Sequence, residues 1–220
     1  WMKSMDFILV GTIGNEYKLD AGDGFTITPN NPAKAALQSS WGSDPEPDAI
    51  RAGAAVIFLQ RGRLQIREMG KAFEAGLDAY QAADLTILAT HLFQSGVTEM
   101  ARTTAPASYL LAVLGSGDMA VATYERPEQV VAWSKFTTDG EYKSVCVIPN
   151  KCGSGDEVWA LVERTINGRR DIFVEVFDGQ LNTDCALVHE DEDNPASGVA
   201  GLTHLEAETV DVVRTTQRSF

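Results

Sequence analysis

The sequence has little cysteine, little histidine and no long apolar run. Its 220 residues include three cysteines and three histidines. Three cysteines in a chain of this size do not make a disulfide framework, and we interpret them as free and inert. No apolar run approaches ~18 residues, so we expect no transmembrane helix and no membrane insertion by this segment. The first six residues also lack the charged and apolar regions of a signal peptide.

Basic residues are scarce as well. The chain has 18 Lys and Arg against 31 Asp and Glu, which gives a formal net charge of -13. A protein that holds nucleic acid by neutralising phosphates needs a basic surface, so this charge argues against tight DNA binding. The composition, 44% hydrophobic and 22% charged, is that of a globular protein with a sizeable core.

The common catalytic and nucleotide-binding motifs are missing. There is no P-loop, nucleophile elbow, zincin motif or dinucleotide fingerprint after a strand. His91, His189 and His204 have no metal-ligand partner two to five residues away. Two Gly-Ser-Gly-Asp segments, at 115–118 and 153–156, lie where turns are needed and are interpreted as turns. The sequence therefore predicts no catalytic residues, no metal site and no cofactor.

What the sequence does contain is a weak repeat of about fifty residues. Four segments share an apolar strand, a short turn and a second strand, and each turn offers Gly, Asn or Asp where a hairpin needs positive φ. The predicted strand pairs are 6–10 with 16–19, 55–59 with 64–68, 108–113 with 119–124, and 157–162 with 172–177.

A further hairpin is predicted between the third and fourth repeats, with strands 130–136 and 143–149. It would give the third unit four strands, the content of one propeller blade. The apolar runs are typical of strands buried on both faces. We therefore predict an all-β, mainly antiparallel fold over residues 1–220, with β-propeller-like repeats. An ordinary β-sandwich with evenly spaced hairpins stays an alternative.

Three regions fall outside the repeat. Residues 84–93 are predicted as one short inserted helix, because Asp84 can cap a helix and apolar residues follow at helical spacing. Residues 26–48 are rich in Pro and Asn and are predicted as a long loop. Residues 184–220 are predicted as an acidic loop and a divergent C-terminal end.

Several sequence blocks, spread in order over residues 1–213, match one known family. The most specific block is 84–93, and the others are 1–2, 7–12, 16–17, 27–29, 38–43, 56–61, 67–68, 122–126, 131–134, 139–140, 144–145, 157–159, 162–168 and 201–206. Through them the chain resembles the tail nozzle protein of short-tailed bacteriophages, also called tail tubular protein B. The turn at 115–118 lacks the Asp-Gly expected there, and the resemblance stops after Val213.

The resemblance implies a structural component of the phage tail and no catalysis. Family members form a six-fold ring below the adaptor ring, extend the channel for DNA ejection and help anchor fibres. The implied partners are copies of the chain itself in a hexameric ring, the tail adaptor protein, a tail fibre and DNA in transient, non-specific passage. The implied location is the virion tail, after synthesis in the bacterial host cytoplasm.

Family members are several times longer than this chain. The chain is therefore expected to be an internal fragment, a prophage-encoded remnant or a trimmed piece of a nozzle subunit. In isolation it is expected to be a monomer or a small oligomer.

The acidic balance suits a DNA channel. A basic wall would hold the phosphates, whereas an acidic wall repels DNA and lets it slide. We hypothesise that part of the net charge faces the channel, with Glu190, Asp191, Glu192 and Asp193 as the candidate run. The same run could bind Ca²⁺, but it lacks the glycine and alternating oxygen ligands of a calcium loop.

Two other classes of function stay open. One is a propeller-type glycan hydrolase, which would need two facing carboxylates in a cleft. The other is a protein-binding module.

Overall fold

The computed structural model describes residues 1–21, 27–71, 80–128, 130–166, 168–179 and 184–185. These residues form four antiparallel sheets, in which consecutive strands pair as neighbours. Sheet 1 contains β1 (Met2–Ser4), β2 (Ile8–Gly11), β3 (Glu16–Asp20) and β4 (Lys34–Ser39). Sheet 2 contains β5 (Ile50–Ala52), β6 (Ala55–Leu59), β7 (Ile66–Lys71) and β8 (Tyr80–Asp84).

The other two sheets follow in the same way along the chain. Sheet 3 contains β9 (Val97–Arg102), β10 (Tyr109–Leu114), β11 (Met119–Glu125) and β12 (Val130–Phe136). Sheet 4 contains β13 (Glu141–Pro149), β14 (Asp156–Ile166) and β15 (Arg169–Val176). One 3₁₀ turn, η1 (Thr90–Leu92), lies between sheets 2 and 3. No helix in the described ranges is long and apolar enough to cross a membrane.

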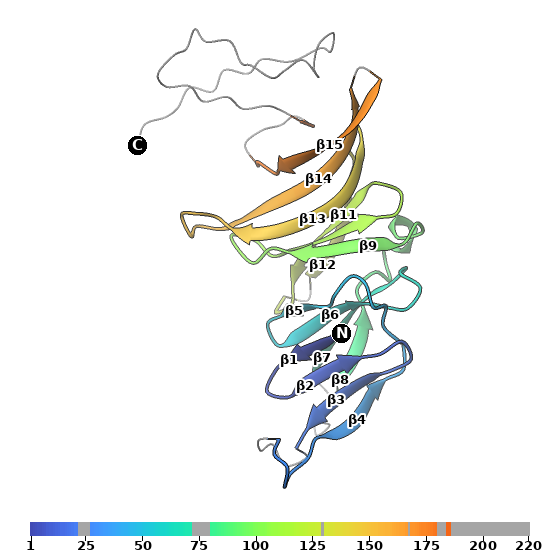
Figure 1. Cartoon of the computed structure of the whole chain (residues 1–220), viewed down its shortest axis with the longest axis vertical. Coiled ribbons are helices and arrows are strands. Elements are labelled where there is room, and N and C mark those ends of the chain that lie inside the picture. Colours follow the sequence, from blue (N-terminus) through green and yellow to red (C-terminus); the bar gives the residue numbers. More distant parts are fainter. Residues whose placement is uncertain (22–26, 72–79, 129, 167, 180–183, 186–220) are drawn as a thin grey trace.

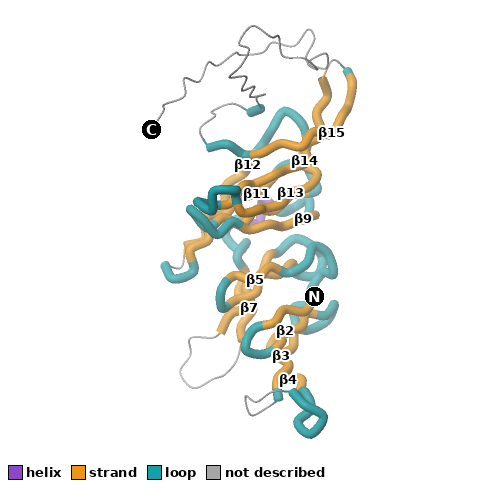
Figure 2. The backbone as a smooth tube through the Cα atoms, turned by 60° about the vertical axis from the view of Figure 1, so that its left-hand side comes forward, coloured by secondary structure: helices purple, strands orange, loops and turns teal. Residues whose placement is uncertain are grey.

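The four sheets stack in sequence order along the long axis of the molecule (Figure 1). Sheet 1 lies near one end and sheet 4 near the other, and strands make up most of the part of the chain that the structure describes (Figure 2). Three apolar clusters fill the spaces between successive sheets. The fold is therefore a row of small sheets, each covering the one before it.

Alternating side chains of the central strands bind the stack together, because successive residues of a strand point to opposite faces. In β6, Val56 and Phe58 join the cluster shared with sheet 1, whereas Ile57 and Leu59 join the cluster shared with sheet 3. In β10, Leu110 faces sheet 2 and Leu111 faces sheet 4 in the same manner. The central strands of sheets 2 and 3 are thus buried on both faces.

The all-β, antiparallel prediction is confirmed, and every predicted strand overlaps an observed one. The four predicted repeats are β2–β3, β6–β7, β10–β11 and β14–β15. Glycines in their turns adopt positive φ, for example Gly62 at 98° and Gly117 at 87°. The finer expectation, a propeller, is not established by this arrangement, because the described sheets follow one another along one axis and do not complete a circle (Figure 1).

The predicted four-stranded unit over residues 108–149 is wrong. β12 does not pair with β13, which instead begins sheet 4. Tyr142 and Val145 of β13 are buried against Leu111 and Val113 of sheet 3. Stacking across the face of sheet 3 buries these side chains, whereas pairing at the mostly exposed edge strand β12 would leave them in solvent.

The predicted helix over residues 84–93 is also wrong. Asp84 ends β8, and its carboxylate accepts hydrogen bonds from the Thr86 backbone N–H at 2.8 Å and the Thr86 hydroxyl at 2.7 Å. These bonds stabilise an Asx turn in place of a helix start. Leu88, which would lie on the apolar face of the helix, is 92% exposed.

The predicted loop over residues 26–48 contains a strand. β4 pairs with β3 from Lys34 opposite Asp20 to Ser39 opposite Glu16. Its side chains are largely exposed, because β4 is the edge strand of sheet 1. The prolines precede and follow this strand and do not interrupt it.

Phe58 provides a test of the stack. Its side chain is fully buried in the cluster between sheets 1 and 2 and contacts Trp1 at a ring centroid distance of 5.3 Å. We expect Phe58→Ala to lower the free energy of unfolding by about 3–5 kcal/mol, through lost burial and a residual cavity. Urea denaturation measures this loss. Exposed Val130→Ala is the control and should change stability by under about 0.5 kcal/mol; equal losses would contradict the stacked core.

Candidate functional site

The residues that the sequence singled out do not form a site in the described structure. Glu190, Asp191, Glu192, Asp193, His189 and His204 lie outside the described residues. His91 is exposed on η1. Cys146, Cys152 and Cys185 are free and exposed. Within the described ranges, no group of three or more His, Cys, Asp or Glu could hold a metal ion.

Both Gly-Ser-Gly-Asp segments are turns, as predicted. The segment at 115–118 joins β10 to β11, and the Gly117 N–H donates to the Leu114 carbonyl at 2.9 Å. The segment at 153–156 leads into β14. The Asp156 carboxylate accepts hydrogen bonds from the Thr104 N–H at 2.6 Å, the Thr104 hydroxyl at 2.8 Å and the Ala105 N–H at 3.2 Å. These bonds lower the pKa of Asp156 and attach sheet 4 to the loop between β9 and β10.

A charged cluster joins sheets 2 and 3. The Tyr124 hydroxyl donates to Glu68 Oε2 at 2.8 Å, and Arg126 Nε donates to Glu68 Oε1 at 2.5 Å. Burial raises the pKa of Tyr124, and its hydrogen bond to Glu68 raises it further. A neutral Tyr124 therefore remains the donor over the physiological range. This cluster holds two sheets in register.

A second cluster lies inside sheet 4. Arg164 is 5% exposed, and its guanidinium donates to Glu175 at 2.6 and 2.8 Å and to the Asp139 carbonyl at 2.7 Å. The hydrogen bonds to Glu175 raise the pKa of Arg164. Asp184 also accepts from Arg164, at 3.3 Å. These partners balance the charge of the buried guanidinium and accept hydrogen bonds from its N–H groups, so the burial of Arg164 is compensated.

A third cluster lies beside sheets 1 and 2. The buried Glu16 accepts hydrogen bonds from the hydroxyls of Ser39 at 2.5 Å and Ser43 at 3.0 Å. Arg67 stacks on the Trp41 ring at 3.7 Å, and burial lowers the pKa of Arg67. In all three clusters the charged groups contact polar or aromatic partners within the stack, so the clusters act as structural contacts between strands and sheets.

Two of the open hollows on the surface of the described residues are lined by neither a carboxylate nor a histidine. One, of about 320 Å³, lies between the β6–β7 turn and the η1 segment and is lined by Arg61, Gly62, Leu64, Gln65, Thr90, Phe93 and Gln94. The other, of about 370 Å³, lies between β4 and β8 and is lined by Gln38, Ser39, Ser40, Trp41, Tyr80, Gln81, Ala82 and Ala83. Neither hollow has the facing carboxylates that glycoside hydrolysis requires.

The most distinctive surface is the outer face of sheet 4. Ile172 is 61% exposed, Val174 is 68% exposed and Val176 is 47% exposed along β15. They pair in register with Glu163, Leu161 and Trp159 of β14, on the side opposite the buried Ala160 and Val162. We define the outer face of sheet 4 as Trp159, Leu161, Ile172, Val174 and Val176.

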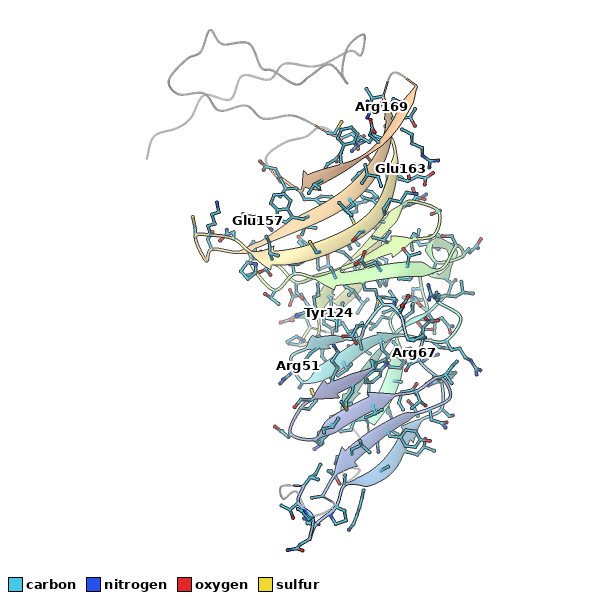
Figure 3. The ribbon with its side chains drawn as sticks, viewed as in Figure 1. Arg51, Arg67, Tyr124, Glu157, Glu163 and Arg169 are labelled. Carbon is cyan, nitrogen blue, oxygen red and sulfur yellow. The ribbon has the colours of Figure 1, made fainter. Side chains whose placement is uncertain are left out.

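Charged residues border the outer face of sheet 4. Lys143 and Arg170 form ion pairs with Glu141 and Glu163 at one end. Glu157 lies toward the other end, where it accepts a hydrogen bond from Trp159 Nε1 at 3.1 Å (Figure 3). An apolar centre with a polar rim is the anatomy of a protein–protein interface. Sequence reasoning missed this face, because Ile172, Phe173 and Val174 are a continuous apolar run that does not show which side of the strand is exposed.

No protein-family model matches this chain, and no curated protein matches it either. The candidate function therefore depends on the chemistry and arrangement of the residues themselves.

The hydrogen bonds to Asp156 predict a pH-dependent stability. These hydrogen bonds lower the pKa of Asp156 in the folded state. Their contribution to the free energy of unfolding is therefore fully present above the unfolded pKa of about 3.9, and it is lost as the pH falls through the lowered pKa of the folded state. We expect Asp156→Asn to lower Tm at pH 7 by roughly 2–4 °C, the shift that about 1 kcal/mol produces in a chain of this size.

Calorimetry measures this effect. The pH is varied from about 2 to about 7, so that it spans the ordinary carboxyl pKa of about 3.9. The Tm difference between wild type and Asp156→Asn should shrink toward zero at the acid end. The exposed Asp6→Asn serves as the matched control. A Tm difference that is unchanged from neutral to acid pH would contradict the assignment.

Proposed function

We propose that this chain is a structural part of the tail nozzle of a short-tailed bacteriophage. In this role it contributes to the ring that extends the DNA-ejection channel below the adaptor and helps to anchor fibres, and it has no reaction to catalyse. The sequence blocks that resemble the nozzle family support the proposal, and they extend over all four sheets of the stack.

The observation that carries the proposal is the uncovered apolar face at the end of the stack. Within the stack, each sheet buries an apolar face against its neighbour. The outer face of sheet 4 carries the same kind of side chains without a cover among the described residues. Exposed apolar patches with polar rims mark interaction sites, and a ring subunit needs such sites.

The sheets are proposed to be propeller blades. Three of them are four-stranded meanders, which is the composition of a blade. Each packs face to face on the next in sequence order, as consecutive blades do. In a nozzle subunit these sheets would form an arc of a propeller body.

The proposed contact with DNA is weak and repulsive. The net charge of -13 disfavours phosphate binding, so a duplex would pass without being held. The run from Glu190 to Asp193 remains the candidate channel-facing segment, and it lies outside the described residues.

Virion incorporation tests this function. An epitope-tagged chain would be expressed in the strain that encodes it while short-tailed particles are produced. We expect the chain to band with purified particles in a density gradient, and gold-labelled antibody to mark the tail in electron micrographs. A tagged unrelated β-protein at equal expression controls for trapping.

A chain that stays in the soluble fraction while particles form would contradict the tail role. Release of reducing ends from a surface glycan by the purified chain would contradict it in favour of a hydrolase.

A further inference from the structure

The hollow between β4 and β8 is an uncharged, polar site with an aromatic wall. β4 and β8 are edge strands of sheets 1 and 2, and they lie against each other. The hollow, of about 370 Å³, is lined by amide residues Gln38 and Gln81, hydroxyl residues Ser39 and Ser40, and Trp41. None of its lining residues is charged. Such a lining favours a neutral ligand that forms several hydrogen bonds.

The hollow is present without a ligand. Ala82 and Ala83 line it from β8, and their small side chains leave the space unfilled. Gln38 connects the two sheets, because its Oε1 accepts a hydrogen bond from the Tyr80 backbone N–H at 2.9 Å. This bond ties β4 to β8, so the sheets need not move apart to admit a ligand.

Trp41 is held in place with one side of its ring free. The Arg67 guanidinium stacks on the ring at 3.7 Å. Arg67 is itself fixed, because it donates to Gln60 Oε1 at 2.5 Å and to the Ala82 carbonyl at 2.9 Å. Trp41 is nevertheless 49% exposed, so the ring face away from Arg67 is open to solvent. A ring that is already immobilised loses little conformational entropy when a ligand stacks on it.

We propose that this hollow binds a neutral saccharide, with one pyranose ring stacked on Trp41. A pyranose has a face of C–H groups, which suits the electron-rich face of an aromatic ring. Its edge carries hydroxyls that both donate and accept hydrogen bonds, and a Gln amide offers one group of each kind. The exposed Gln81 amide and the exposed Ser40 hydroxyl are the partners for this edge.

An extended peptide is the other neutral ligand that amide groups suit, and the structure disfavours it. A peptide that adds to a strand edge pairs with free backbone groups. Here Gln38 Oε1 already accepts from the Tyr80 N–H of β8. Gln38 Nε2 donates to the Ala36 and Leu37 carbonyls of β4, both at 3.3 Å. These backbone groups are therefore paired within the chain.

The proposed site binds a saccharide without cleaving it. Its lining contains no carboxylate, and glycoside hydrolysis requires two. The inference goes beyond the proposed nozzle role and does not depend on it.

A titration followed by proton–nitrogen correlation NMR tests the site. The probes are cellobiose and N,N′-diacetylchitobiose, neutral disaccharides built from pyranose rings. We expect millimolar concentrations of one or both to shift the signals of the Trp41 indole N–H and the Gln81 side-chain amide. The indole signals of Trp1, Trp133 and Trp159 should stay in place. Sorbitol, which carries hydroxyls but no ring, is the ligand control and should shift neither signal.

Substitutions in the hollow test which groups hold the saccharide, and circular dichroism checks that each variant folds. Trp41→Ala should weaken binding about tenfold or more through the lost stacking, whereas Trp41→Phe keeps an aromatic face and should retain most of the affinity. Gln81→Ala should weaken binding roughly 2- to 10-fold, the effect of one lost hydrogen bond. Gln81 is exposed, so this variant should fold even if Trp41→Ala does not. Gln65→Ala makes the same change in the other hollow and is the matched control, which should bind like the wild type.

The inference fails if neither disaccharide shifts these two signals, if sorbitol shifts them equally, or if Trp41→Ala and Gln81→Ala bind like the wild type. It also fails if an uncharged, end-capped pentapeptide of Ser, Thr and Val shifts them while the disaccharides do not.

The same data separate this inference from the tail role. Saccharide binding without virion incorporation supports the site and contradicts the nozzle. Incorporation without saccharide binding does the reverse.

Discussion

A sheet that is apolar on both faces must be covered on both faces. All five residues of β6 and five of the six in β10 are buried, and neither strand has a polar side to turn toward water. Burial of this apolar surface is the dominant favourable term in folding. It forces sheets 2 and 3 between neighbours, and the linear stack of sheets follows from that requirement.

The polar contacts between the sheets make the stack specific. Glu68 with Tyr124 and Arg126 joins sheet 2 to sheet 3, and Asp156 joins sheet 4 to the loop after β9. Apolar burial alone would tolerate a sliding of one sheet over another, whereas such a sliding would break the hydrogen bonds of these carboxylates. These charged residues thus fix the register of the sheets, and the two hollows described above have no lining carboxylate.

The sequence predicted the hairpins well because their signals are local. Continuous apolar runs such as Ala55–Leu59 and glycine turns such as Gly117 need no distant partner to be recognised. β4 was missed because both of its faces are largely exposed. Its sequence therefore lacks the alternation of apolar and polar residues that identifies a half-buried strand. The helix at 84–93 was predicted wrongly because the helical spacing of Leu85 and Leu88 was not matched by burial of Leu88.

The candidate surfaces could not be found from the sequence. Ile172, Phe173 and Val174 are a continuous apolar run, so the sequence does not show which side of this strand is covered, and that depends on the order of the sheets. That order is a tertiary property, and it turns the apolar side of β15 away from the stack. The acidic run predicted as channel-facing lies outside the described residues and stays a prediction.

Amide hydrogen exchange of the dilute chain tests the central claim, that sheets 2 and 3 are anchored from both faces. The account predicts that amides of β6, β10 and β11 exchange last, and that those of β4 and β15, with one face uncovered and an edge position, exchange early. Protection of β4 and β15 equal to that of β10 would contradict it.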